Sequence, residues 1–169
     1  MGLRLIAAVA QDDVIGFQDG IPWRKTKEDR TRYREDMARF KTLTANHPVI
    51  MGRKTFNSID KKYVPLDSGR TTIVISKTMN FEDNPGIVIC RTLPEAVRKA
   101  SQINENFYCA GGQTLYGALI GKLAERLEIT EIHRRFEGDT FFPEINPKVW
   151  REAFREDHEN YSFVTYERS

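Results

Sequence analysis

The chain has 169 residues, 40% of them apolar, and its 26 basic and 24 acidic side chains give a formal net charge of +2. A chain of this length buries roughly 70% of its unfolded surface, so residues 1–169 can form one domain without disulfides or a structural metal. The nearly balanced charge argues against nucleic acid or an anionic membrane as a partner, and two cysteines cannot make a disulfide framework. We therefore expect a cytoplasmic protein without a metal site.

The first half of the chain predicts two buried strands separated by a loop and a helix. A nearly continuous apolar run predicts a central strand over residues 3–10. A glycine-containing loop over 11–23 follows, and loops of this length in compact domains are usually functional. Residues 24–44 have apolar side chains at helical spacing among many charges, which predicts one helix. The short apolar run 49–51 is typical of a fully buried strand.

The strand at 49–51 leads into a pattern that suits a phosphate group. Gly52 lets the backbone turn closely before a helix expected over 55–59, and Arg53 and Lys54 lie at the start of that helix. Strand, glycine and helix in this order form a common anion site in α/β proteins. The two cations strengthen the prediction, although two solvated side chains after a core strand would give the same pattern.

The second half continues to alternate strands with helices. Thr92 and Glu95 have capping-box spacing at the start of one helix. The predicted elements are strands over 71–76, 86–90, 107–110 and 126–135, helices over 92–102 and 113–124, and two closing strands around 158–160. This order predicts a single α/β domain with a central, mostly parallel eight-stranded sheet, an antiparallel C-terminal edge hairpin and about four flanking helices.

Gly111 and Gly112 repeat the strand, glycine and helix pattern after the strand at 107–110. Two such junctions are enough to hold one dinucleotide, but the G-x-G-x-x-G fingerprint is absent, so a standard dinucleotide domain is not predicted. Asp36 shares a helical stripe with Met37 and Phe40, which places an ionisable group toward an apolar pocket and should raise its pKa.

Taken together, the segments resemble the dihydrofolate reductase family over essentially the whole chain. The matching segments are 5–8, 14–16, 22–23, 36–41, 48–56, 65–66 with 69–70, 111–116 and 137–143. The resemblance implies NADPH-dependent reduction of 7,8-dihydrofolate to tetrahydrofolate, with a hydride given to the pterin and a proton to N5. It further implies a role in one-carbon metabolism, membership of a class of antifolate targets, a monomeric protein and only small-molecule partners.

The resemblance also implies roles for particular residues. The implied catalytic residues are Asp36, Trp23, Tyr116 and Thr130, with Trp23 holding a water near Asp36. The implied substrate-binding residues are Ile6, Ala8, Asp36, Met37, Phe40, Ile59, Leu66, Arg70, Ala110 and Thr130. The implied NADPH-binding residues are Ala8, Ile15, Gly16, Gly52, Arg53, Lys54, Thr55, Ser76, Lys77, Gly111, Gly112, Gln113, Thr114 and Leu115, with a cis peptide joining the two last-named glycines.

The chain departs from the family pattern in three places, one of which is Ile21 in the loop expected to be mobile. Residues 24–35 make the segment before Asp36 longer than in bacterial members by about eight residues, or roughly two helical turns. They also introduce Asp29 as a rival acid, although Asp36 keeps the downstream pattern without gaps. Asp67 and Ser68 stand where the family usually has proline. Two alternatives stay open from sequence: the pyrimidine reductase of riboflavin synthesis, and a non-catalytic NADP-binding module.

Overall fold

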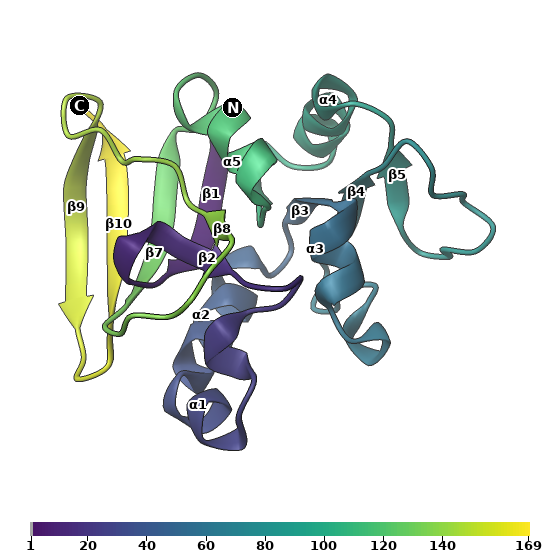
Figure 1. Ribbon diagram of the computed structural model, residues 1–169. Helices are drawn as coiled ribbons and strands as arrows, with labels where there is room; N and C mark the ends of the chain where they lie inside the picture. The colour runs from purple at the N-terminus through teal and green to yellow at the C-terminus, as the bar shows by residue number, and fades with distance from the viewer. Residues whose placement is uncertain (1) are drawn as a thin grey trace.

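The computed structural model describes residues 2–169 and is built on one eight-stranded sheet with the order β5-β4-β3-β6-β1-β7-β10-β9 (Figure 1). Its strands are β1 (Gly2–Val9), β3 (Pro48–Gly52), β4 (Thr71–Ile75), β5 (Val88–Cys90), β6 (Asn106–Cys109), β7 (Arg126–Ile132), β9 (Trp150–Asp157) and β10 (Tyr161–Arg168). The helices are α1 (Lys27–Arg32), α2 (Arg34–Thr44), α3 (Arg53–Ser58), α4 (Leu93–Ile103) and α5 (Gln113–Ile120).

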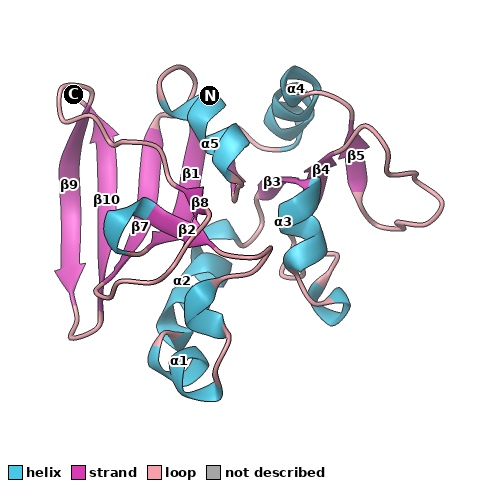
Figure 2. Cartoon of the chain, in the orientation of Figure 1, coloured by secondary structure: helices cyan, strands magenta, loops and turns pink. Residues whose placement is uncertain are grey.

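The pairing of the strands confirms the predicted sheet. All pairs from β5 across to β7 are parallel, whereas β10 runs antiparallel to both β7 and β9. The parallel strands need crossover connections, which α2, α4 and the segments beside them supply. The last two strands need only the tight turn between Asp157 and Tyr161, so the chain ends in the predicted hairpin at one edge (Figure 2).

Helices cover both faces of the sheet, with α4 and α5 on one side and α2 and α3 on the other (Figure 1). Strand β3 shows how the sequence serves both layers. Ile50 packs into the cluster beneath α4 and α5, whereas its neighbours Val49 and Met51 pack into the cluster that includes Phe40 and Phe56. Successive side chains of a strand point to opposite faces, so a run that is apolar at every position is buried on both.

The predicted helix over 24–44 is wrong as one element, because two helices occupy this range. The backbone of Tyr33 leaves the helical region, with φ of −110° and ψ of 20°, and separates α1 from α2. The side chain of Thr26 caps α1 by accepting a hydrogen bond from the amide of Asp29. Tyr33 is buried beside Trp23 and Ile132. The insertion therefore adds a short helix, which accounts for five α-helices in residues 2–169 where about four were expected.

Smaller differences concern the ends of elements. The long loop after β1 contains a short strand, β2 (Val14–Gly16), which pairs with β8 (Thr140–Phe141). Helix α3 begins at Arg53 rather than at Thr55, so both cations lie in its first turn. In the part of the chain that the structure describes, no helix is long and apolar enough to cross a membrane.

Candidate functional site

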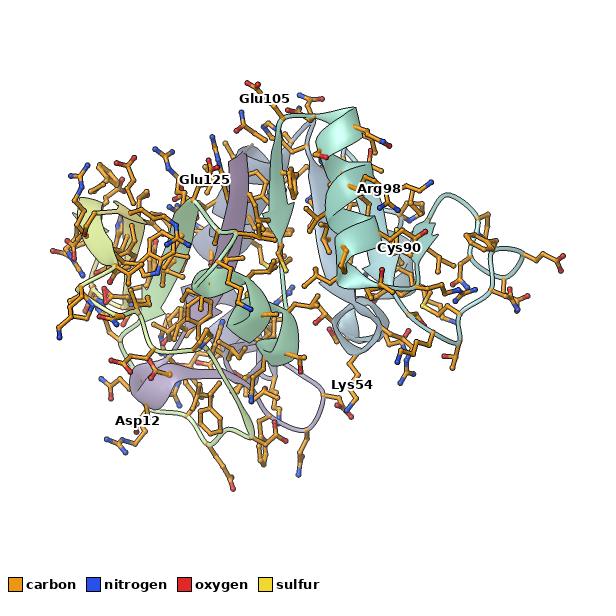
Figure 3. The ribbon with its side chains drawn as sticks, turned by 90° about the horizontal axis from the view of Figure 1, so that it is seen from above. Asp12, Lys54, Cys90, Arg98, Glu105 and Glu125 are labelled. Atoms are coloured by element: carbon orange, nitrogen blue, oxygen red, sulfur yellow. The ribbon has the colours of Figure 1, made fainter. Side chains whose placement is uncertain are left out.

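The candidate site lies at the carboxyl ends of the parallel strands, where ligands bind in open α/β sheets. Figure 3 shows both ends of the parallel strands. Glu105 and Glu125, which precede β6 and β7, lie at the amino ends, and Lys54 and Asp12 lie at the opposite, carboxyl ends. Most candidate residues of the sequence analysis lie toward the carboxyl ends of the strands, because they belong to the later part of β1, β3, β4, β6 or β7, follow one of these strands directly, or lie on the helix after it. Leu66 and Arg70 instead lie in the segment before β4.

Asp36 supplies the acidic group of the site from the first turn of α2. The residue is half-buried, and burial of its carboxyl group raises its pKa above the usual range of aspartate. A hydrogen bond from the side chain of Thr130, and then the charges of Arg39 and Arg24, oppose this rise without cancelling it. The predicted direction of the pKa shift is therefore confirmed, and its cause is loss of water around the carboxylate.

The strand residues predicted for the site lie around this acid. Thr130 on β7 is the register partner of Ala8 on β1, so the two residues lie side by side in the sheet. Tyr116 on α5 is buried, and its hydroxyl donates a hydrogen bond of 2.6 Å to the carbonyl oxygen of Ile6. Burial raises the pKa of Tyr116 well above its ordinary value, and the charge of Asp36 adds to the rise. The structure thus brings Ile6, Ala8, Asp36, Tyr116 and Thr130 together.

Trp23 lies beneath the loop that precedes α1 and is 1% exposed. Its indole Nε1–H is buried and has no acceptor among the described residues. Buried donors are nearly always paired, so this group is available to an acceptor that is not part of the protein. The ring also packs against Phe136, with 5.6 Å between the ring centroids, which fixes its orientation.

An apolar wall adjoins the acid. Phe40, Ile59 and Ala110 pack against the buried cluster that contains Leu66, so four of the predicted substrate-binding residues share one surface. Met37 does not join this cluster and is 39% exposed. The wall is formed by α2, the residue after α3, the loop before β4 and the residue after β6.

The two glycine junctions lie against each other at the same edge of the sheet. The amide of Gly52 donates a hydrogen bond of 2.9 Å to the carbonyl oxygen of Gly111. A Cβ atom on Gly112 would lie 3.4 Å from Oγ1 of Thr55, and one on Gly52 would lie 3.9 Å from the Leu115 side chain. Side chains at these positions would fill the space between the junctions. The peptide bond from Gly111 to Gly112 is cis, as the resemblance implied.

The outer residues predicted for the cofactor are less uniformly placed. Arg53, Lys54 and Lys77 are exposed, as cations that meet a phosphate need to be. Ser76 is buried, and its hydroxyl accepts hydrogen bonds from the amides of residues 78 and 79, so it shapes the turn after β4. Gln113 accepts a hydrogen bond of 2.7 Å from the amide of Phe141 and so holds β8 against α5.

The remaining cofactor candidates differ in exposure. Ile15 packs against the cluster that contains Tyr116, and Gly16 is buried at the end of β2. Thr114 is exposed in the first turn of α5. These residues surround the glycine junctions without making contacts that identify a ligand.

Asp29, the rival acid, has a structural role. Its Oδ1 atom lies 2.9 Å from Nη1 of Arg134 and 3.2 Å from Nη1 of Arg32. The pair with Arg134 fastens α1 to the segment after β7, and the pair with Arg32 lies within α1. Because its carboxylate is already paired, Asp29 does not offer the free acid that the site requires, and the geometry favours Asp36.

Arg39 and Glu128 form a buried ion pair that no pattern in the sequence singled out. Nη2 of Arg39 lies 2.8 Å from Oε2 of Glu128, and the two side chains are 15% and 4% exposed. Arg39 lies three residues after Asp36, on the same side of α2, so helical spacing offered a signal for its position. Its partner is on β7, 89 residues away in the chain, and no local pattern indicates such a pair.

The fold and the site define a class of protein: an α/β enzyme with a half-buried acid beside a nucleotide-type junction at the carboxyl ends of its strands. The dihydrofolate reductase family model matches residues 2–168. The chain is 35% identical to the dihydrofolate reductase HdrB of Haloferax volcanii over 170 residues, covering 97% of this chain and 82% of that protein. It is 36% identical to a dihydrofolate reductase of Neisseria gonorrhoeae over 170 residues, covering 97% and 96% of the two chains.

A more distant organism gives the same result, since a dihydrofolate reductase of Drosophila melanogaster is 35% identical over 153 residues, covering 88% of this chain and 82% of that protein. The chain belongs to the dihydrofolate reductase family. The resemblance stated from sequence is therefore confirmed over nearly all of the chain.

Proposed function

We propose that this protein is an NADPH-dependent oxidoreductase that reduces 7,8-dihydrofolate to tetrahydrofolate. The observation that carries the proposal is Asp36, a half-buried acid with a raised pKa, held by Thr130 at the carboxyl ends of the strands. Family membership supports the same reaction. It does not favour the riboflavin-pathway reductase, and an acid with a raised pKa has no evident use in a purely cofactor-binding module.

The residues around the glycine junctions fit NADPH. A pyrophosphate needs close backbone approach and unpaired amides, which Gly112 and the first turn of α5 supply. Arg53, Lys54 and Lys77 are exposed cations near the ends of β3 and β4, suited to the additional phosphate of NADPH. When bound there, NADPH supplies the hydride that reduces the pterin.

The remaining chemistry is assigned to the chain's own side chains. We infer that the Asp36 carboxylate accepts two parallel N–H bonds from the pterin edge, the geometry in which a carboxylate otherwise meets arginine. The wall of Phe40, Ile59, Leu66 and Ala110 packs against the aminobenzoyl ring and excludes water. Thr130 orients the carboxylate through its hydrogen bond.

Reduction of the C=N bond also requires a proton at N5. Asp36 does not reach every atom of the pterin, but the free indole N–H of Trp23 can hold a water molecule that carries the proton from solvent. Tyr116 keeps its proton because its pKa is raised, so its hydroxyl continues to hold the carbonyl oxygen of Ile6 at neutral pH. Loss of NADPH absorbance on mixing the protein with NADPH and dihydrofolate tests the proposal, and no loss at any pH would refute it.

Selectivity for NADPH over NADH should depend on the exposed cations. We expect Arg53→Gln or Lys77→Gln to raise KM for NADPH about tenfold, because one hydrogen bond to a charged group contributes about 1.5 kcal/mol or more. KM for NADH should change little, since NADH lacks the additional phosphate. Steady-state kinetics with both cofactors measure the ratio.

Lys122→Gln is the matched control for these substitutions. Lys122 is exposed after the end of α5, and its replacement removes one positive charge, as Arg53→Gln and Lys77→Gln do. If Lys122→Gln raised KM for NADPH as much as Arg53→Gln, the effect would come from overall charge. The proposed phosphate contact would then be wrong.

The expected monomeric state also stays a prediction. Sedimentation equilibrium of the purified chain should give a mass near 19.6 kDa, and a mass near twice that value would contradict it.

A further inference from the structure

Arg70, the residue expected to bind the substrate's glutamate, already holds a carboxylate of the protein itself. Its Nη2 atom donates a hydrogen bond of 2.7 Å to Oδ1 of Asp67, and its Nε atom donates one of 2.8 Å to the carbonyl oxygen of Asp67. Nε and Nη2 form an edge that a carboxylate ordinarily takes with two parallel bonds. One residue of the protein therefore occupies the edge that a substrate carboxylate would use.

The two partners differ sharply in their surroundings. The Arg70 side chain is 6% exposed, whereas that of Asp67 is 70% exposed. The guanidinium is held from below by Thr44, whose Oγ1 lies 3.4 Å from Nη1, and by the Phe40 ring, whose centroid lies 5.8 Å from its central carbon. Arg70 is thus fixed beside the apolar wall of the site, while the Asp67 side chain lies at the surface.

Further contacts keep Asp67 ionised and close to Arg70. Ser68 Oγ donates a hydrogen bond of 3.2 Å to Oδ1 of Asp67, and Nζ of Lys41 lies 3.5 Å from its Oδ2. The pKa of Asp67 is lowered, first by the hydrogen bond from Arg70 and then by that from Ser68. Asp67 is consequently a carboxylate at neutral pH, and it has the same charged group as the end of a glutamate.

We propose that Asp67 is a specificity-determining residue that competes with carboxylate groups of ligands for Arg70. The inference rests on the proposed reduction of dihydrofolate. A ligand with a glutamate tail must displace the Asp67 carboxylate from Arg70 or share the guanidinium with it. The negative charge of the tail is also repelled by the negative charge of Asp67. A pterin without the tail meets neither obstacle. Asp67 therefore reduces the degree to which the enzyme prefers substrates with a glutamate tail over pterins without one.

The size of the effect follows from exposure. Because the Asp67 side chain is exposed, solvent screens its competition for Arg70, so the expected change is only a few-fold. Asp67→Asn and Asp67→Ala should each raise kcat/KM for dihydrofolate, relative to kcat/KM for a 6-methyl-dihydropterin without a glutamate tail, by about two- to fivefold. The gain should shrink at high salt, because screening weakens the competition.

The experiment measures both kcat/KM values at saturating NADPH for the full-length protein and its variants. Asp60→Asn is the matched control: Asp60 is exposed in the same region and lies 3.9 Å from Lys62, away from Arg70. Combining Asp67→Ala with Arg70→Met should remove the gain, because no shared guanidinium remains.

Each outcome decides the inference. The measured quantity is the ratio of kcat/KM for dihydrofolate to kcat/KM for the tail-less dihydropterin. If this ratio stays constant or falls in the Asp67 variants, Asp67 only braces Arg70 and the inference is overturned. If the ratio rises equally in Asp60→Asn, the effect comes from net charge and the inference is also overturned. If the unmodified protein reduced neither substrate, the proposed function would fail and the inference with it. If it reduced dihydrofolate with an unchanged ratio in the Asp67 variants, only the inference would fail.

Discussion

Asp36→Asn is expected to lower kcat for dihydrofolate reduction at neutral pH by about 10²- to 10⁴-fold, the contribution of a positioned acid or base. Asparagine has nearly the same shape, so the protein should fold and should still bind NADPH. It presents one N–H group where the carboxylate presents an oxygen, and therefore it cannot accept both N–H bonds of the pterin edge. Stopped-flow hydride transfer and NADPH fluorescence titration measure the two effects separately.

The loss should be smallest at low pH. The pKa of Asp36 is raised because its carboxyl group is buried, so the native protein can keep a proton at the site up to a higher pH than an ordinary aspartate. The asparagine variant carries no such group and depends on substrate that is already protonated in solution. Its rate should therefore increase as the pH falls, and the ratio of native to variant rates should decrease.

Asp29→Asn is the control for this experiment, since Asp29 is the other aspartate of the same region. Its carboxylate is paired with Arg134 and Arg32, both of them partly exposed, so its loss should cost about 1 kcal/mol of stability and leave kcat nearly unchanged. If Asp29→Asn abolished turnover and Asp36→Asn did not, the placement of the insertion would be wrong.

The parts of the site that the sequence predicted best are those with a local cause. Gly52 ends one short buried strand and Gly111 comes shortly after another, and Gly111 has a φ of 113°, which residues with a side chain rarely adopt. The parallel order of the strands then brings the two junctions into hydrogen-bonding contact, although they lie far apart in sequence. The local strand–glycine pattern and the parallel order of the strands were together sufficient to predict where the two glycine junctions meet.

The parts that escaped prediction depend on partners distant in sequence. Nothing near Tyr33 marks the break between α1 and α2, because the residue leaves the helix in order to bury its ring beside Trp23. The charges of residues 24–44 were interpreted as a solvated helix surface, yet Arg39 among them points to a buried acid on β7. Asp67 could be recognised as a departure from the family, but only the fold shows that it reaches Arg70.

The buried pair of Arg39 and Glu128 gives the second large expected effect. Glu128 Oε2 also accepts a hydrogen bond of 2.7 Å from Thr165, so the carboxylate is fully enclosed between α2, β7 and β10. Arg39→Met leaves this acid without its principal partner and should lower the free energy of unfolding by about 3 kcal/mol or more. Urea unfolding followed by tryptophan fluorescence measures the loss, which is a large part of a typical stability of about 5 to 15 kcal/mol.

Removing both charges should restore most of that stability. Arg39→Met combined with Glu128→Leu buries apolar groups in place of an ion pair, a change that is often neutral in proteins, although Thr165 then loses an acceptor. Glu152→Gln is the control for an exposed pair, because Glu152 and Arg155 are 40% and 33% exposed, and it should cost less than about 1 kcal/mol. A double variant as unstable as Arg39→Met would contradict this account.

Arg39→Met should also have a functional consequence, because Arg39 contributes both to the stability of α2 and to the pKa of Asp36. The charge of Arg39 lowers the pKa of Asp36 and partly offsets the effect of burial. Without it, the carboxylate form is less favoured, so the pKa of Asp36 should rise further. The pH at which the hydride-transfer rate declines should then move upward in Arg39→Met, whereas Glu152→Gln should leave it in place. A profile that did not move would mean that Arg39 supports only the packing of the helix.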